Sequence, residues 1–389
     1  MKMKQIRTTI LAALLALTWA CQPVEGPGAQ PATTPPPPPV TATATTAPYV
    51  YLTPTPGYPE AGFGPRGFPV DIDPLTGLGA DPALLERRPI IIKVSNLPRG
   101  VRPQSGLSQA DIVYEYYTEE GTTRFAAIYY SREAEQVGSI RSARFFDEHL
   151  VRMYAAWFVF GSGDERVRER LWDSGFANRL IVEWQAECPA LCRPDPLTNL
   201  LFGNTVAIRE YIRQRGLPDE KQNLEGMRFQ LEAPPGGVPA SQVYAWYSAA
   251  IYNRWDYDPG SGRYFRSSDI ENALEGQPEV YAPLTDALTG APITAENVVI
   301  LLMEHEFFSV SPEIVEMDFS GSGPAYAFRD GQAYELEWTR PTEDAVVSLS
   351  SADGTPFPFK PGETWFEVMG VSTKIGQEED AWRFEMRFP

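Results

Sequence analysis

The sequence is poor in cysteine and histidine, and this limits the chemistry open to the protein. Its 389 residues include three cysteines and two histidines, His149 and His305. Neither histidine lies near the later cysteines in a spacing that would hold zinc. Nothing resembles a phosphate-binding loop, a nucleophile elbow or a metal triad. We therefore expect no metal and no cofactor.

Positive charge is also scarce. The chain carries 33 Lys and Arg against 51 Asp and Glu, for a formal net charge of −18. Because phosphate backbones are bound through net or local positive charge, nucleic acid is excluded as a partner. An anionic membrane surface is an equally poor target unless a covalent lipid holds the protein there.

Long apolar runs are confined to the first residues of the chain. Lys2, Lys4 and Arg7 form a basic start, and residues 8–20 follow as a mostly apolar stretch rich in Leu and Ala. These 13 residues are too few to span a bilayer as a helix, which takes about 20. The pattern predicts a signal peptide over residues 1–20 and an extracytoplasmic location.

The apolar run ends at a cysteine, Cys21, in a sequence that resembles the lipobox of bacterial lipoproteins. Thr18 and Trp19 depart from that pattern, which usually has an aliphatic and a small residue at these positions. We predict a lipid on Cys21 that anchors the protein to the outer face of the cytoplasmic membrane. Ordinary cleavage after Ala20 is the alternative, and it would leave Cys21 as an unmodified N-terminus.

A proline-rich segment follows the cysteine. Residues 22–69 hold 14 of the 37 prolines, including an unbroken run at 35–39. Such a segment buries too little apolar surface to offset the entropy of ordering it. Pro-rich chains also extend by about 3.1 Å per residue. We predict a disordered, lipid-anchored linker over residues 21–69 that holds a domain away from the membrane.

The rest of the chain has the composition of a folded protein, and its length suggests two domains. Strands interleaved with helices predict an α/β layered domain over residues 70–217. A connector is expected over 218–239, where Pro234-Pro-Gly-Gly237 interrupts regular structure. Alternating strands with Asp-Gly turns predict a mostly antiparallel, β-rich domain over 240–389. The predicted fold class is α+β.

Three smaller patterns carry specific expectations. Cys188 and Cys192 should form a local disulfide in an oxidising compartment, since their spacing is not the Cys-x-x-Cys of redox enzymes. An Asp-x-Leu-Thr pattern recurs at residues 73–76, 195–198 and 286–289, and it predicts capped turns rather than calcium sites. An aromatic run is expected to be sheet core, with sugar stacking as the alternative if the rings face solvent. Its members are Tyr244, Trp246, Tyr247, Tyr252, Trp255, Tyr257 and Tyr264.

Polar residues gather at three places in the first domain. One group precedes a strand, a second alternates along that strand, and a third lies at a predicted helix start capped by Ser142. Free backbone N–H groups and guanidinium groups at a helix start can hold an anion. The candidate ligand-binding residues are Arg102, Gln104, Ser105, Arg124, Arg141, Ser142 and Arg144.

Two acids provide the candidates for catalysis. Asp111 and Glu115 fall on one face of the strand, and Arg124 on the partner strand is expected to meet Glu115. A structural ion-pair network is one interpretation of this arrangement. A general acid and base, with Arg141 and Arg144 holding a substrate, is another. An open pocket shared by both carboxylates and the arginines would distinguish the two.

The sequence resembles the YerB-like family of bacterial extracytoplasmic lipoproteins, whose domains have no settled function. In the first domain, the segments that carry the resemblance are 74–77, Arg88-Pro89, 102–115, 123–125 and 138–144. In the second, they are Tyr257-Asp258, 264–266, Asn297-Val298 and 362–365. The resemblance implies an α/β first domain and a β-rich second domain. It implies no reaction.

These observations leave three hypotheses. The first is a non-catalytic envelope lipoprotein that binds an anionic or polar envelope ligand or a partner protein through an Arg-rich cleft in the first domain. The second is an envelope hydrolase acting on a glycan or phosphodiester through Asp111 and Glu115. The third is a passive scaffold that docks an envelope protein complex, which an exposed sheet edge or apolar patch would favour.

Overall fold

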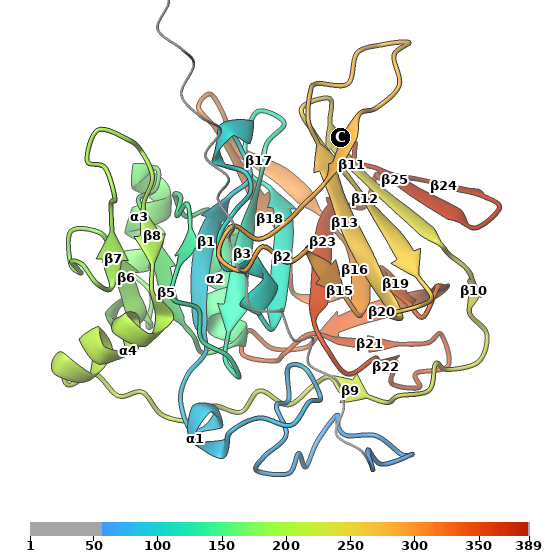
Figure 1. Cartoon of the computed structure of the whole chain (residues 1–389), viewed down its shortest axis with the longest axis horizontal. Helices are drawn as coiled ribbons and strands as arrows, with labels where there is room; N and C mark the ends of the chain where they lie inside the picture. Colours follow the sequence, from blue (N-terminus) through green and yellow to red (C-terminus); the bar gives the residue numbers. More distant parts are fainter. Residues whose placement is uncertain (1–56, 388–389) are drawn as a thin grey trace, which may run out of the picture. The chain divides into compact units, whose positions relative to one another are not determined.

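The structure, a computed structural model, describes residues 57–387, and the fold is β-rich (Figure 1). The predicted signal peptide, Cys21 and linker residues up to 56 lie outside the described residues. Within 57–387, no helix combines the length and the apolar character needed to cross a membrane. The described residues fall within one compact unit.

One large sheet contains strands from both predicted domains, in the order β10-β20-β19-β16-β23-β2-β3-β1-β5-β6, with β21 paired to β20. The first half of the chain supplies β1 (Ile90–Ser95), β2 (Ile112–Tyr117), β3 (Thr123–Tyr129), β5 (Trp157–Phe160) and β6 (Leu180–Val182). The second half supplies β10 (Val238–Pro239), β16 (Asn297–Met303), β19 (Gly321–Arg329), β20 (Gln332–Arg340), β21 (Ser348–Ser350) and β23 (Thr364–Gly370). The two halves therefore share a single hydrogen-bonded sheet.

The junction between the halves is the parallel pair β2–β23. Its register runs from Ile112 opposite Thr364 to Tyr116 opposite Val368. On its other side, β23 pairs in parallel with β16. Figure 1 shows β23 lying between β2 and β16. The predicted boundary at 218–239 consequently does not separate two independent sheets.

A second sheet belongs to the C-terminal half alone. Its order is β14-β13-β12-β11-β25-β24, with β15 paired to β13, and all its pairs are antiparallel except β11–β25. The strands are β11 (Gln242–Ser248), β12 (Ile251–Asp258), β13 (Arg263–Asp269), β14 (Tyr281–Pro283), β15 (Thr294–Ala295), β24 (Lys374–Glu378) and β25 (Ala381–Glu385). Short sheets pair β17 (His305–Val310) with β18 (Glu313–Met317), β9 (Arg228–Phe229) with β22 (Pro358–Phe359), and β8 (Phe202–Gly203) with β4 (Val137–Gly138) and β7 (Leu191–Cys192).

The helices are short. They are α1 (Pro82–Leu85), α2 (Phe146–Met153), α3 (Glu165–Trp172) and α4 (Thr205–Gln214), with 3₁₀ turns η1 (Arg99–Val101), η2 (Leu107–Gln109) and η3 (Ala177–Arg179). Asp164 and Asn204 cap α3 and α4 by accepting from backbone N–H groups of the first turn. Such side-chain caps satisfy donors that the helix itself leaves unpaired.

The predicted cap of the second helix was wrong. The sequence placed the helix start at Ser142, whereas α2 begins at Phe146 and its N-cap residue, Phe145, makes no side-chain cap bond. Asp147 instead turns back and accepts from the Arg144 N–H at 2.7 Å. Ser142 consequently does not lie at a helix N-terminus, and the anion site expected there loses its backbone donors.

The boundaries of the linker and the connector also differ from the prediction. Residues 57–69 were assigned to the linker, yet Phe63 forms a β-bridge with Phe229, and the Phe68 ring lies 6.4 Å from the Phe229 ring. Within the predicted connector, β9 and β10 pair with β22 and β20. Composition alone could not predict that these segments are ordered, because the residues with which they pair lie far away in the sequence.

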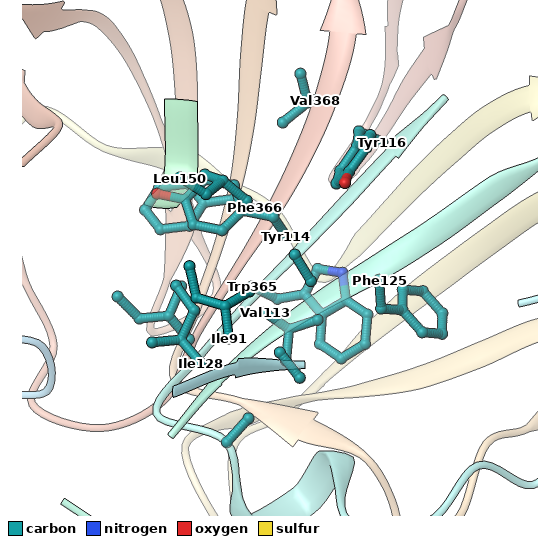
Figure 2. Packing of buried hydrophobic residues seen from close by; sticks show 14 of the residues in the cluster. Ile91, Val113, Tyr114, Tyr116, Phe125, Ile128, Leu150, Trp365, Phe366 and Val368 are labelled. Atoms are coloured by element: carbon teal, nitrogen blue, oxygen red, sulfur yellow. The ribbon is translucent and has the colours of Figure 1, made fainter. Parts of the chain in front are cut away.

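The apolar core is continuous across the β2–β23 junction. Tyr114 stacks on Phe366 with ring centroids 4.6 Å apart, and Phe125 meets Trp365 edge-on at 5.2 Å. Figure 2 shows these rings with Val113, Ile128 and Val368 around them. Of the aromatic run, Tyr247, Tyr252, Trp255 and Tyr264 are buried, whereas Tyr244, Trp246 and Tyr257 are half-buried. The run thus contributes mainly to the core.

Candidate functional site

Arg102 is held by residues of both halves of the chain. Its guanidinium donates to the Asp269 carboxylate at the end of β13 and to the side-chain oxygen of Asn96. Arg99 binds the same carboxylate, with 2.6 Å between Nε and Oδ2. Only 9% of the Arg102 side chain is exposed. Arg102 therefore joins a loop of the first half to the second sheet.

Gln104 and Ser105 are buried beside Arg102 in the same loop. The amide of Gln104 donates to the Ser95 carbonyl at 3.0 Å. Ser105 exchanges backbone hydrogen bonds with Gly138. These contacts fix the path of the loop. Both side chains are buried, so neither faces a ligand.

The Asp-x-Leu-Thr pattern forms turns, as expected. In all three copies the Asp carboxylate accepts from the N–H two residues later, at 2.9 Å for Asp73, 2.8 Å for Asp195 and 2.8 Å for Asp286. Asp286 goes further and accepts from Gly106 N–H and Ser108 N–H, at 2.8 and 2.7 Å. This turn of the second half thereby fixes a loop of the first half, which the sequence did not reveal.

Glu115 is paired with a residue that the sequence did not indicate. The expected partner was Arg124, but the Glu115 carboxylate lies 2.6 Å from the guanidinium of Arg266 on β13. Arg266 also binds Glu367 on β23 at 3.0 Å. All three side chains are at most 1% exposed. They form a buried Glu–Arg–Glu triad at the β2–β23 junction.

The remaining oxygens of the triad are also satisfied. Asn96 and Thr123 donate to Glu115 at 3.0 and 2.6 Å. Trp255 and Tyr247 each donate to Glu367 at 3.0 Å. Burial raises the pKa of Glu115 to about 7, with Arg266 opposing the shift and Glu367 adding to it. The triad therefore carries two carboxylates on one guanidinium.

Asp111 is buried in a separate set of contacts. Its carboxylate accepts from Tyr130 N–H at 2.6 Å, Ser131 N–H at 2.9 Å and the Ser131 hydroxyl at 2.5 Å. Both Asp111 and Glu115 are fully shielded from solvent. The condition set for a hydrolase, two carboxylates in one open pocket with the arginines, is not met.

Three of the predicted arginines lie near Glu119 and α2. Arg124 and Arg144 both pair with the Glu119 carboxylate, with N–O distances of 2.8 Å from Arg124 Nη2 and 2.5 Å from Arg144 Nε. Arg141 donates to the Asn199 carbonyl at 2.6 Å and, within residues 57–387, has no carboxylate within 4.0 Å. Arg102, with its own acidic partner, is not part of this group. The four arginines thus have three different sets of partners.

A buried lysine group lies beneath these arginines. Lys93 is completely buried in β1 and pairs with Asp147 at 3.2 Å, while Tyr116 donates its hydroxyl to the same carboxylate. Burial lowers the pKa of Lys93 to about 7, Asp147 opposes the shift, and the charges of Arg124 and Arg144 add to it. A lysine within a mostly apolar strand is the sequence signal that could have identified this buried group.

A groove of about 1000 Å³ opens elsewhere on the described surface. Its lining includes Arg66, Arg88, Arg152 and Arg179 together with residues of the segment 339–356. None of the predicted ligand-binding residues lines it. No local motif marks these arginines, because the groove forms only where segments distant in the sequence meet.

Cysteine and metal chemistry add little to the site. Cys188 and Cys192 form a disulfide with Cα atoms 4.8 Å apart. Among the described residues, no group of three or more His, Cys, Asp or Glu side chains is arranged to hold a metal ion.

The chain belongs to a two-part family of unknown function. Residues 75–217 match the family described as "Protein of unknown function (DUF3048) N-terminal domain", and residues 243–366 match its C-terminal domain. This is the YerB-like family that the sequence resembled.

A relative and a solved structure support this assignment. The Bacillus subtilis protein named "Putative lipoprotein YerB" is 29% identical over 310 residues, which cover 76% of this chain and 85% of the relative. The crystal structure of YerB from the same organism matches with a TM-score of 0.64 and 27% identity. That match covers 77% of this chain and 96% of YerB.

Proposed function

We propose that this protein is a non-catalytic lipoprotein of the cell envelope that binds an anionic or polar envelope ligand or a partner protein. A signal peptide over residues 1–20 exports it, a lipid on Cys21 anchors it to the outer face of the cytoplasmic membrane, and a proline-rich linker follows. The N-terminal half is taken to be an α/β layer, the arrangement that alternating strands and helices favour.

The observation that carries the proposal is the burial of the predicted catalytic acids. A general acid or base must come within hydrogen-bonding reach of the group it serves. Asp111 and Glu115 are fully buried, and each binds groups of its own protein. The relative named as a lipoprotein supports the anchor.

The anchor is tested by changing Cys21 to Ser and fractionating cells that express each form. We expect wild type in the membrane fraction and the variant released from it. Mass spectrometry of the mature N-terminus provides the direct check. An unmodified Cys21 in the wild-type protein would contradict the anchor.

The binding function is tested by capture of envelope components from detergent extracts. Arg141→Ala is the informative variant, because Arg141 has no acidic partner within residues 57–387. Arg144→Ala is the comparison, since Arg144 is already paired with Glu119. We expect reduced capture with Arg141→Ala at unchanged stability. Unaltered capture with both variants would remove the predicted arginines from the site.

A scaffold is the second candidate, and exposed surface in the C-terminal half supports it. All five residues of the edge strand β24 are exposed. The β17–β18 hairpin exposes 41% of Phe307, 51% of Phe308 and 76% of Val310. Unpaired edges and apolar patches are common features of docking surfaces. Capture of the same partner proteins by wild type and a Phe307→Ser/Val310→Ser variant would exclude the hairpin from this role.

A further inference from the structure

From the groove lined by Arg66, Arg88, Arg152 and Arg179 we infer a binding site for a small polyhydroxylated oxyanion, such as a sugar phosphate or an acidic sugar. This inference goes beyond the proposed function, because it adds a second binding site and names the class of ligand for that site. The site is distinct from the arginines that the sequence indicated.

The groove is positive in a strongly negative chain. Its lining contains four arginines and only two acids, Glu225 and Asp344, whereas the whole chain has a formal net charge of −18. The arginines come from four places: the segment before β1, α2, η3 and residues 57–69. The tertiary fold therefore brings arginines from four separate segments together in the groove.

Three of the four guanidinium groups form no close ion pair with a described carboxylate. Of the four, only Arg152 has carboxylates of residues 57–387 within 4.0 Å, those of Glu148 at 2.7 Å and Glu343 at 3.4 Å, while Asp219 and Glu220 act on Arg88 from farther away. Arg179 makes long contacts, of 3.5 and 3.4 Å, to two backbone carbonyls, and its guanidinium lies over the Phe176 ring, 5.4 Å from the ring centroid. Structural arginines normally pair with carboxylates, as Arg266 and Arg144 do here. Arg179 thus retains a charge and donors for a ligand.

Arg88 also retains an unused donor. Its Nη1 donates to the Ala155 carbonyl at 2.8 Å, but its Nε is buried and has no hydrogen-bond partner in the described structure. This unpaired donor costs free energy in the unliganded protein, and a ligand acceptor reaches it only if the Arg88 side chain shifts.

The arginines also act on one another electrostatically. Burial and the charge of Arg88 lower the pKa of Arg179 to about 10, with Asp344 opposing the shift and Arg152 adding a smaller part to it. Like charges held together in this way are relieved when an anion binds between them. Guanidinium groups match phosphate and carboxylate by donating two parallel hydrogen bonds.

The size and the other side chains of the groove define the rest of the ligand. A volume of about 1000 Å³ is at the upper end for small-molecule sites and far exceeds an inorganic ion. Asn178, Asn223, Thr342 and Ser348 line the walls with amide and hydroxyl groups that can bind ligand hydroxyls. A long polyanion is disfavoured because the strongly negative net charge of the chain repels it. A small hydroxylated anion fits best.

The test is a titration of the full chain in detergent with four probes. Glucose 1-phosphate and glucuronate have both an anionic group and sugar hydroxyl groups. Inorganic phosphate has only the negative charge, and glucose has only the hydroxyl groups. We expect the first two to bind more tightly than phosphate, glucose not to bind, and affinity to fall with added salt. A parallel arm with glycerol 3-phosphate and with phosphatidylglycerol dispersed in the same detergent shows whether the anion is a free solute or a lipid headgroup; saturable binding of either that Arg179→Met weakens supports the site.

Two opposite variants make the result decisive. Arg179→Met should weaken glucose 1-phosphate binding by about tenfold or more, because a charge-assisted contact is lost. Asp344→Asn removes an exposed acid beside Arg179 and should tighten binding a few-fold, roughly in line with a partly screened charge pair. Arg166→Met, a change of equal charge on α3 outside the groove, is the control and should have no effect.

The inference is overturned if none of the anionic probes binds, or if neither Arg179→Met nor Asp344→Asn changes the affinity. The Asp344→Asn arm remains informative even if Arg179→Met fails to fold, since Asp344 lies at the surface. The two proposals can fail separately. If none of the anionic probes binds but capture of envelope components still depends on Arg141, this inference is refuted and the proposed function stands.

Discussion

The buried Glu115–Arg266–Glu367 triad allows a prediction with a calculable size. Changing Arg266 to Met keeps an unbranched side chain in place but leaves two carboxylates in the core without their counterion. Breaking a buried ion pair from one side costs about 3–5 kcal/mol. Protonation would remove these unpaired charges. For a carboxyl with an ordinary pKa of 4.5, protonation costs about 3.4 kcal/mol at pH 7 and about 0.7 kcal/mol at pH 5.

The destabilisation should therefore depend strongly on pH. We expect Arg266→Met to lower the free energy of unfolding by roughly 3–5 kcal/mol at pH 7, with the loss shrinking by roughly 3 kcal/mol at pH 5. Burial raises the pKa of Glu115 in the folded protein, so the stability tied to its proton is present below pH 4.5 and is lost as pH rises toward 7. Both proteins gain stability as pH falls, so the wild-type gain offsets part of the pH dependence of the loss, which arises from protonation of two unpaired carboxyls in the variant against one raised pKa in the wild type.

Urea unfolding followed by tryptophan fluorescence provides the measurement, at pH 5 and pH 7. The triple variant Arg266→Met/Glu115→Gln/Glu367→Gln removes all three charges and should lose the pH dependence. Arg213→Met, whose side chain is 73% exposed and pairs with Glu210, is the control and should change stability by less than about 0.5 kcal/mol. An equal loss for Arg266→Met at both pH values would refute the electrostatic account and leave packing as the cause.

Three further predictions concern pH, the disulfide and the sheet. Burial and the charge of Arg340 lower the pKa of His149 to about 4, so its stability contribution is present above pH 6.5 and is lost as pH falls toward 4; unfolding curves of His149→Gln should lack this component. The double variant Cys188→Ser/Cys192→Ser should lose at most about 2 kcal/mol in thermal unfolding, because the closed loop is short. A fragment of residues 57–217 lacks β23 and should give poorly dispersed NMR spectra, whereas a well-folded fragment would contradict the shared sheet.

The sequence predicted those features that depend on neighbours along the chain. The Asp-x-Leu-Thr pattern forms the expected turns, in which each Asp carboxylate accepts from the N–H two residues later. The family assignment and the β-rich class were also confirmed. In each case the determining contact or conformation lies within a few residues.

The partners of the charged side chains could not be predicted in the same way. Arg266 binds Glu115 from 151 residues away, and no local spacing distinguishes it from Arg124, which is much closer in sequence. The groove arginines are likewise brought together only by the tertiary fold. Charge patterns along a strand favoured an ion-pair network as one of two interpretations, but the choice of partner required the register of β2 against β23.

The position of β23 also has a consequence for the order in which the chain folds. Residues 364–370 lie far from β2 in the sequence, yet they fill the space between β2 and β16. Until they do so, both strands present open edges, which invite pairing with other chains. Closing so long a loop is also slow compared with local folding. The central sheet is therefore expected to close late in folding, after the hairpins that form from local contacts.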